Sequence, residues 1–185
     1  MNGEGGPRAA AETASQPAKA DATSVNQIPP VGPHPTVGVV FVGALLWSSP
    51  AAAAPVLDLV VDDDMATPSL SAILAAVRRL VAAGTPPGPQ LVLDAIQRVG
   101  TLKAFAAEDL RDAVTSGAQP MALREYGAAV VSGALRRRIE SASHSLASAA
   151  ADAPEEALAA MVSRATVTCL DCAARLEELR GEADG

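Results

Sequence analysis

Two cysteines three positions apart are the first residues in this chain that could do chemistry. Cys169 and Cys172 stand in the pattern Cys-Leu-Asp-Cys, a spacing found in redox-active disulfides and in zinc sites. A structural zinc site needs four ligands, yet the sequence holds no further cysteine and only two histidines, His34 and His144. We therefore interpret both cysteines as small apolar residues in a helix pair and predict no metal and no cofactor. Redox or metal chemistry is the alternative.

Acidic and hydroxyl side chains offer no better catalytic arrangement. The run Asp62 to Asp64 lacks the alternating ligands, the glycine and the distal glutamate of a calcium loop, so we predict a solvated turn there. His144 lies between Ser143 and Ser145, and successive side chains on a helix point about 100° apart. The three side chains would therefore point in different directions and would not form one catalytic group. The sequence therefore predicts no catalytic residues, and the chain is not expected to be an enzyme.

Basic residues gather at Arg136, Arg137 and Arg138. Three consecutive side chains fan over roughly 200° of a helix, so they cannot all face one phosphate track. The net charge of −7 also disfavours a nucleic-acid surface. We predict that these arginines, together with Glu140, form a charged face that meets a protein partner. No direct, sequence-specific binding of nucleic acid is expected.

Two long helices must position the cysteines and the arginines. Apolar residues between 155 and 180 follow alternating four- and three-residue steps, which is a heptad seam. A second helix over 121–150 shows similar spacing, and Pro154 with two acidic residues after it suits a new helix start. The sequence therefore predicts an antiparallel helical hairpin over 121–180. The seam residues are Val131, Leu135, Ile139, Ala142, Leu146 and Ala149 on the first helix, and Leu158, Val162, Ala165, Cys169, Cys172, Leu176 and Leu179 on the second.

Composition divides the remaining chain. Residues 1–36 are rich in proline, glycine and alanine and poor in large apolar side chains, so we predict a disordered tail; residues 181–185 are expected to be a flexible C-terminus. Helix starts and stops between 37 and 120 predict a small bundle of four or five short helices. The chain is 49% hydrophobic but only 2% aromatic. We therefore expect an all-α fold: a compact bundle followed by the long hairpin.

The apolar run from Val37 to Trp47 permits more than one interpretation. Periodicity alone fits a helix capped by Thr36 or a buried strand. The Ser, Pro and Ala residues that follow resemble a signal-peptide cleavage region, so a secreted or cell-surface helical protein, with residues 37–54 as the signal peptide, is the alternative. Eleven apolar residues are too few to span a bilayer, and no basic region directly precedes them. We expect no membrane association and a cytoplasmic location.

The order of these elements resembles the N-terminal domain of bacterial replicative helicases of the DnaB type. The resemblance covers about 37 to 180. It rests on Gly43-Ala44-Leu45-Leu46, on Asp63-Asp64-Met65 with Thr67-Pro68-Ser69, on the segment from Val92 to Leu102, and above all on Asp112 to Arg138 with Tyr126 inside it. The family commonly has aromatic residues where Met65 and Ala66 stand here. No G-x-x-x-x-G-K-[ST] loop is present, so we expect no helicase or ATPase activity from this chain.

The resemblance implies an assembly role in DNA replication. In the family this domain dimerises through its hairpin, forms a collar as a trimer of dimers, and docks primase. We therefore expect a non-catalytic interaction and oligomerisation module whose partners are its own copies and possibly primase or a replicative helicase; a truncated remnant of a helicase is also compatible. The expected interface residues are Tyr126, Val131, Leu135, Ile139, Leu146, Leu158, Val162, Leu176 and Leu179, with Arg136, Arg137, Arg138 and Glu140 as the charged contacts.

Overall fold

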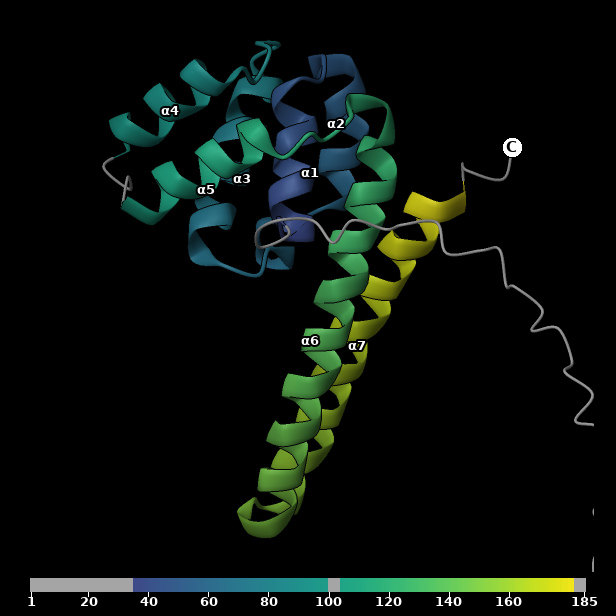
Figure 1. Ribbon diagram of the computed structural model, residues 1–185. Helices are drawn as coiled ribbons and strands as arrows, with labels where there is room; N and C mark the ends of the chain where they lie inside the picture. The colour runs from purple at the N-terminus through teal and green to yellow at the C-terminus, as the bar shows by residue number, and fades with distance from the viewer. Residues whose placement is uncertain (1–34, 100–103, 182–185) are drawn as a thin grey trace, which may run out of the picture. The chain divides into compact units, whose positions relative to one another are not determined.

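The structure is a computed structural model that describes residues 35–99 and 104–181. Contacts divide the chain into the units Met1–Pro33 and His34–Gly185, and the second unit is the one described below. Within the described residues the regular elements are all helical, as predicted (Figure 1). In chain order they are α1 (Val37–Leu46), α2 (Pro50–Leu59), the 3₁₀ turn η1 (Asp62–Asp64), α3 (Pro68–Ala82), α4 (Pro89–Arg98), α5 (Ala104–Thr115), the 3₁₀ turn η2 (Pro120–Ala122), α6 (Leu123–Asp152) and α7 (Glu155–Gly181).

Hydroxyl caps start three of the helices. The side chains of Thr36, Ser49 and Thr67 accept hydrogen bonds from backbone N–H groups in the first turns of α1, α2 and α3, which satisfies donors that lack a partner inside the helix. The apolar residues alone predict a short helix over 56–60, but the cap at Ser49 starts α2 six residues earlier, at Pro50. Pro55 lies inside α2 because its ring is on the exposed side, where the carbonyl group that loses its N–H partner can reach water.

Helix α1 is the centre of the bundle and is not a strand. Phe41, Val42 and Leu45 are fully buried, and α1 packs against α3, α5 and α6. Gly43 permits the close approach of α5, because a Cβ atom there would lie 2.5 Å from the Ala113 carbonyl oxygen. The small residue before the two leucines thus has a packing role: it lets two helices touch through their backbones.

The peripheral helices bury less than the sequence pattern predicts. Helix α3 buries its predicted face, including Ile73, Leu74 and Val77, because it has α1, α2, α4 and α5 around it. Helix α4 packs mainly on α3 and α5 and buries Val92 and Ile96, whereas Leu91 and Val99 are exposed. The apolar spacing of this segment predicts that Leu91, Val92, Ala95, Ile96 and Val99 are all buried. That prediction is wrong for Leu91 and Val99, because α4 lies at the edge of the bundle and has a narrow buried stripe.

Helices α6 and α7 form the predicted antiparallel hairpin and run side by side over their whole length (Figure 1). The chain turns between them at Ala153 and Pro154. The N-terminal third of α6 packs on α1 and α2 and the C-terminal part of α7 on α2. The predicted disorder before residue 35 and flexibility after 181 fall almost wholly outside the described residues. One half of the hairpin is therefore joined to the bundle, and the other half has only its own second arm.

Candidate protein interaction surface

The hairpin seam faces inward within the chain's own fold. Val131, Leu176 and Leu179 are buried, and Tyr126 and Leu135 are half-buried against the core cluster. Leu146 and Leu158, near the turn, are half-buried as well. Most residues of the predicted interface thus already pack against other residues of the same chain. Their burial therefore stabilises the hairpin within one chain.

Two seam residues were assigned to the wrong position. Ile139 and Val162 are 49% and 51% exposed, and the inward positions are taken by Arg138 and Met161, which are half-buried. In both places the heptad step is one residue shorter than predicted. Arg138 turns inward because an acidic side chain of the bundle binds it, so an electrostatic contact selects the register there and the apolar pattern does not.

That acidic side chain is Asp64, in η1. Its carboxylate has no solvent exposure and accepts hydrogen bonds from Arg138 Nη1 at 2.6 Å, from Arg175 Nη1 at 2.6 Å and from the Val61 backbone N–H at 2.9 Å. The Asp64 carbonyl oxygen accepts a further bond from Arg137. We call Asp64, Arg138 and Arg175 the Asp64 cluster. It joins the bundle to both arms of the hairpin at one point, which corrects the prediction of a solvated turn.

Electrostatics favour the charged form of this buried acid. Burial alone raises the pKa of Asp64, but the hydrogen bonds from Arg175, from the Val61 N–H and from Arg138 outweigh it and hold the pKa below its ordinary value. The hydrogen bond to Asp64 in turn raises the pKa of Arg175. A buried ion pair keeps its charges only when the partners saturate each other. The charges of Asp64, Arg138 and Arg175 therefore depend on one another, and loss of one would destabilise the others.

Arginine side chains also bind the backbone that leads from the end of α2 to Asp64. Arg78 of α3 donates to the carbonyl oxygens of Leu57 and Val60 at 2.6 and 2.7 Å, and Arg175 donates a further bond to the Leu59 carbonyl oxygen at 2.7 Å. These bonds satisfy carbonyl groups at the end of α2 that lack a partner inside the helix. The chain from 57 to 64 is thus held by both the bundle and the hairpin.

These contacts correct the predicted charged face. Arg137 and Arg138 were expected to meet a partner protein, but both bind Asp64 within the chain. Arg136 and Glu140 are exposed and remain candidates for contacts with a partner. Reversal of Arg137 and Arg138 to glutamate would place two acids beside buried Asp64, so it would disrupt the fold and cannot test partner binding.

Both cysteines are free and lie on the inward side of α7, as predicted. Cys172 is fully buried, and its sulfur lies 3.0 Å from Arg138 Nη1 and 3.7 Å from the Val131 carbonyl oxygen. Cys169 is half-buried. Across residues 35–99 and 104–181, no three His, Cys, Asp or Glu side chains are grouped closely enough to hold a metal ion. The described side chains thus offer the cysteines packing partners and no metal-ligand set.

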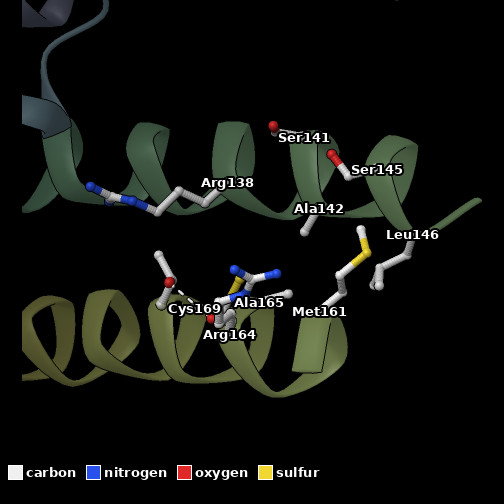
Figure 2. Close-up of a pocket in the computed structure, with 10 residues that line it drawn as sticks. Arg138, Ser141, Ala142, Ser145, Leu146, Met161, Arg164, Ala165 and Cys169 are labelled. Atoms are coloured by element: carbon white, nitrogen blue, oxygen red, sulfur yellow. Dashed lines mark hydrogen bonds between the residues drawn. The ribbon is translucent and has the colours of Figure 1, made fainter. Parts of the chain in front are cut away.

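A groove of about 320 Å³ opens between the two arms beside Cys169 (Figure 2). Its floor carries small residues such as Ala142 and Ala165, with Met161 and Leu146 toward the turn and the guanidinium groups of Arg138 and Arg164 at the sides. His144 lies outside the groove, with Nδ1 2.9 Å from the Glu140 carbonyl oxygen. Because the Arg138 guanidinium binds Asp64, the lining offers small apolar side chains and the guanidinium of Arg164, with no acid–base pair among the lining residues.

Helix α7 also satisfies a length and composition test for a membrane span. It carries Asp171 and Arg175, and Arg175 is bound to Asp64 of the bundle. The apolar residues that α7 buries face α6 and the bundle. In this structure α7 is the second arm of the hairpin, and its composition is only weak support for a span.

Comparison with solved structures identifies the fold. A crystal structure of the N-terminal domain of DnaB helicase from Mycobacterium tuberculosis is similar to this chain, with a TM-score of 0.62 and 24% sequence identity. The match covers 76% of this chain and 99% of the DnaB domain. No protein-family model matches the chain, and no curated protein sequence matches it. The chain thus has the fold of a DnaB N-terminal domain, as its sequence resemblance predicted.

Proposed function

We propose that this chain is a non-catalytic interaction module of DNA replication, which assembles with its own copies and docks a replicative helicase or a primase in the cytoplasm. The observation that carries the proposal is the match to 99% of a DnaB N-terminal domain, bundle and hairpin together. A fold shared over that whole length supports a shared role in assembly, although fold alone does not fix function.

The outer half of the hairpin supports an assembly role. Large apolar side chains are exposed there on both arms: Ile139, Val162, Val167 and Leu170. Exposed apolar residues gathered on one element are typical of a protein contact surface. Each arm has only the other arm beside it in this region, so a second hairpin or a partner protein would remove these side chains from water.

The charge distribution favours protein over nucleic acid. Four arginines, Arg78, Arg137, Arg138 and Arg175, make hydrogen bonds to groups of the chain itself. The net charge is −7, and a nucleic-acid surface requires a basic patch that follows the phosphates. The binding partner we propose is therefore another protein, with no sequence-specific nucleic-acid contact by this chain.

The secreted alternative conflicts with the position of α1 in the core. A signal peptide over residues 37–54 would be removed on export and would take with it Phe41 and Leu45, which are fully buried. Loss of such residues would leave α3, α5 and α6 without the helix on which all three pack. This packing supports retention of the segment and a cytoplasmic protein.

Mixing of purified proteins tests the proposal. Sedimentation velocity of the full chain, alone and with the DnaB-type helicase and the primase of the same cell, should show self-association and a complex with at least one of them. Val162→Asp and Leu170→Asp should weaken these complexes, and Leu91→Asp, at an exposed position of α4, is the matched control. A chain that stays monomeric and binds neither protein would contradict the proposal.

A further inference from the structure

Cys169 and Cys172 lie on the inward side of α7, about one turn apart. In an α-helix, Cα atoms three residues apart are about 5 Å from each other, and disulfide-bonded cysteines have Cα atoms about 4.4–6.8 Å apart. Both thiols are free in the structure. A disulfide between them would therefore need no change in the distance between the two Cα atoms.

The two thiols differ in their access to solvent. Cys169 is half-buried and lines the groove between the arms of the hairpin (Figure 2), so a small oxidant can reach its sulfur from there. Cys172 has no exposed area. Redox-sensing pairs commonly combine an accessible cysteine that reacts first with a neighbouring cysteine that then forms the disulfide. Cys169 suits the first role and Cys172 the second.

The buried thiol contacts the Asp64 cluster through one atom. Arg138 Nη1 lies 3.0 Å from Cys172 Sγ and 2.6 Å from Asp64 Oδ1. The Cys172 thiol also donates to the Val131 carbonyl oxygen at 3.7 Å. Cations beside the sulfur are typical of cysteines that react with disulfides. A chemical change at Cys172 therefore acts directly on a side chain that joins the hairpin to the bundle.

We propose that Cys169 and Cys172 form a reversible disulfide within one chain, and that this bond weakens the attachment of the hairpin to the bundle. The oxidant is a small disulfide such as oxidised glutathione. The Cys169 sulfur attacks it, forms a mixed disulfide and releases one glutathione. The Cys172 sulfur then attacks the Cys169 sulfur, the mixed bond breaks and the second glutathione leaves. Two protein thiols are oxidised, the glutathione disulfide is reduced, and the two thiol protons pass to the two glutathione molecules.

The new bond removes two contacts of Cys172. Its sulfur no longer carries a proton for the Val131 carbonyl oxygen, and it turns along α7 toward Cys169 and away from Arg138. Arg138 then loses the neighbour that holds its Nη1 group beside Asp64, and a buried ion pair depends on such additional contacts. Disulfides in a reducing compartment are typically transient and redox-sensing. The pair therefore has the features of a redox-sensitive switch at the base of the hairpin.

Mass spectrometry of the full chain tests the bond. The protein is incubated with a mixture of oxidised and reduced glutathione, and free thiols are then alkylated in denaturant. The wild type should carry neither alkyl groups nor glutathione, and dithiothreitol should restore two alkylated thiols. Cys172→Ala should retain glutathione on Cys169, because no second thiol can displace it. Cys169→Ala should keep a free thiol, because the buried Cys172 cannot react first.

Hydrogen exchange of the oxidised and reduced wild type tests the switch. Amides at 61–65 and 135–139 should exchange about tenfold faster in the oxidised chain, whereas those at 73–77 in α3 should be unchanged. The same treatment of Cys169→Ala should leave all three segments unchanged. Thiols that stay free, or that pair only between two chains, would overturn the proposal, and so would a disulfide that leaves exchange unchanged. These measurements concern one chain, so their outcome is independent of the proposed assembly with partners.

Discussion

The two halves of the hairpin differ in how they are held. Near the bundle, α6 buries Leu123, Val130 and Ala134, and α7 buries Cys172 and Leu176. Beyond it, no residue from 135 to 171 is buried. The heptad spacing is similar in both halves, so the difference comes from the number of neighbours. A single antiparallel helix covers only a narrow stripe of apolar side chains and leaves them half-buried. They become fully buried where the bundle packs against the hairpin as well.

The difference indicates separate roles for the two halves. The near half is anchored by the Asp64 cluster and by Arg124, whose Nε donates to the Leu179 carbonyl oxygen at 2.9 Å. The far half leaves Ile139, Val167 and Leu170 exposed. We expect substitutions in the near half to change stability, and substitutions in the far half to change assembly.

The largest effect should follow from the loss of the charge on Asp64. Asp64→Asn keeps the shape of the side chain but leaves Arg138 and Arg175 without their anion. Removing one partner of a buried ion pair typically costs about 3–5 kcal/mol, and urea denaturation should show a loss of that order in the free energy of unfolding. Asp63→Asn, at an exposed neighbouring position with no ion pair to these arginines among the described residues, should change it little. Equal effects would mean that the cluster does not anchor the hairpin.

Acid should remove the same contribution. The pKa of Asp64 is lower in the fold than its ordinary value of 3.8, so the stabilisation is complete above pH 3.8 and is lost as pH falls through the lower, folded-state pKa. The difference in unfolding free energy between wild type and Asp64→Asn should therefore be constant from neutral pH to about pH 5 and shrink below pH 3.8. A difference that grows on acidification would contradict the lowered pKa.

An intermediate effect is expected for the cysteines. Cys172→Ala removes a fully buried side chain and should cost about 1–2 kcal/mol. Cys169→Ala, at the half-buried position where the two halves of the hairpin meet, should cost less than about 0.5 kcal/mol. Thermal or urea denaturation under reducing conditions measures both. Stoichiometric zinc in the purified protein, lost with either cysteine, would instead revive the metal interpretation.

The smallest effect on stability should come from the far half. Ile139→Gln and Val162→Gln replace exposed side chains and should change the unfolding free energy by less than about 0.5 kcal/mol, while they weaken self-association. Hydrogen exchange of the single chain should also be faster between 140 and 168 than near the bundle, because few buried contacts protect those amides. Uniform protection along the hairpin would remove the distinction between its halves.

Local patterns in the sequence were sufficient for most helices and for their order, but not for the choice of helix over strand at 37–46 or for the start of α2. Thr67 before Pro68 is a typical helix start and is the N-cap of α3, and alternating three- and four-residue steps predicted both arms of the hairpin. The same steps could not choose between Arg138 and Ile139, or between Met161 and Val162, because adjacent residues differ by only about 100° around the helix. In the first case, the long-range contact between Arg138 and Asp64 determines which of the two residues faces inward.

The Asp64 cluster was not predicted because its members are far apart in the chain. Asp64 lies 74 residues from Arg138 and 111 from Arg175, and no periodicity connects them. One signal was present: Arg138 and Arg175 each stand beside an apolar seam position. Arg164 and Arg180 also stand beside seam positions, so this signal did not single out Arg138 and Arg175 or identify Asp64 as their partner. The match to the DnaB fold needed only the helix order, so it was predictable without the cluster.

The distance between these partners also bears on how the protein is made. During synthesis Asp64 emerges long before Arg175, and closing so large a loop carries an entropic cost that later contacts must offset. A nascent or prematurely released chain that lacks residue 175 has a bundle in which Asp64 is without the hydrogen bonds that Arg175 donates in the complete fold. Such a chain is less stable and more accessible to proteases than the finished one. The Asp64 cluster thereby acts as a check on completion: the fold reaches its full stability only after the second arm has been translated.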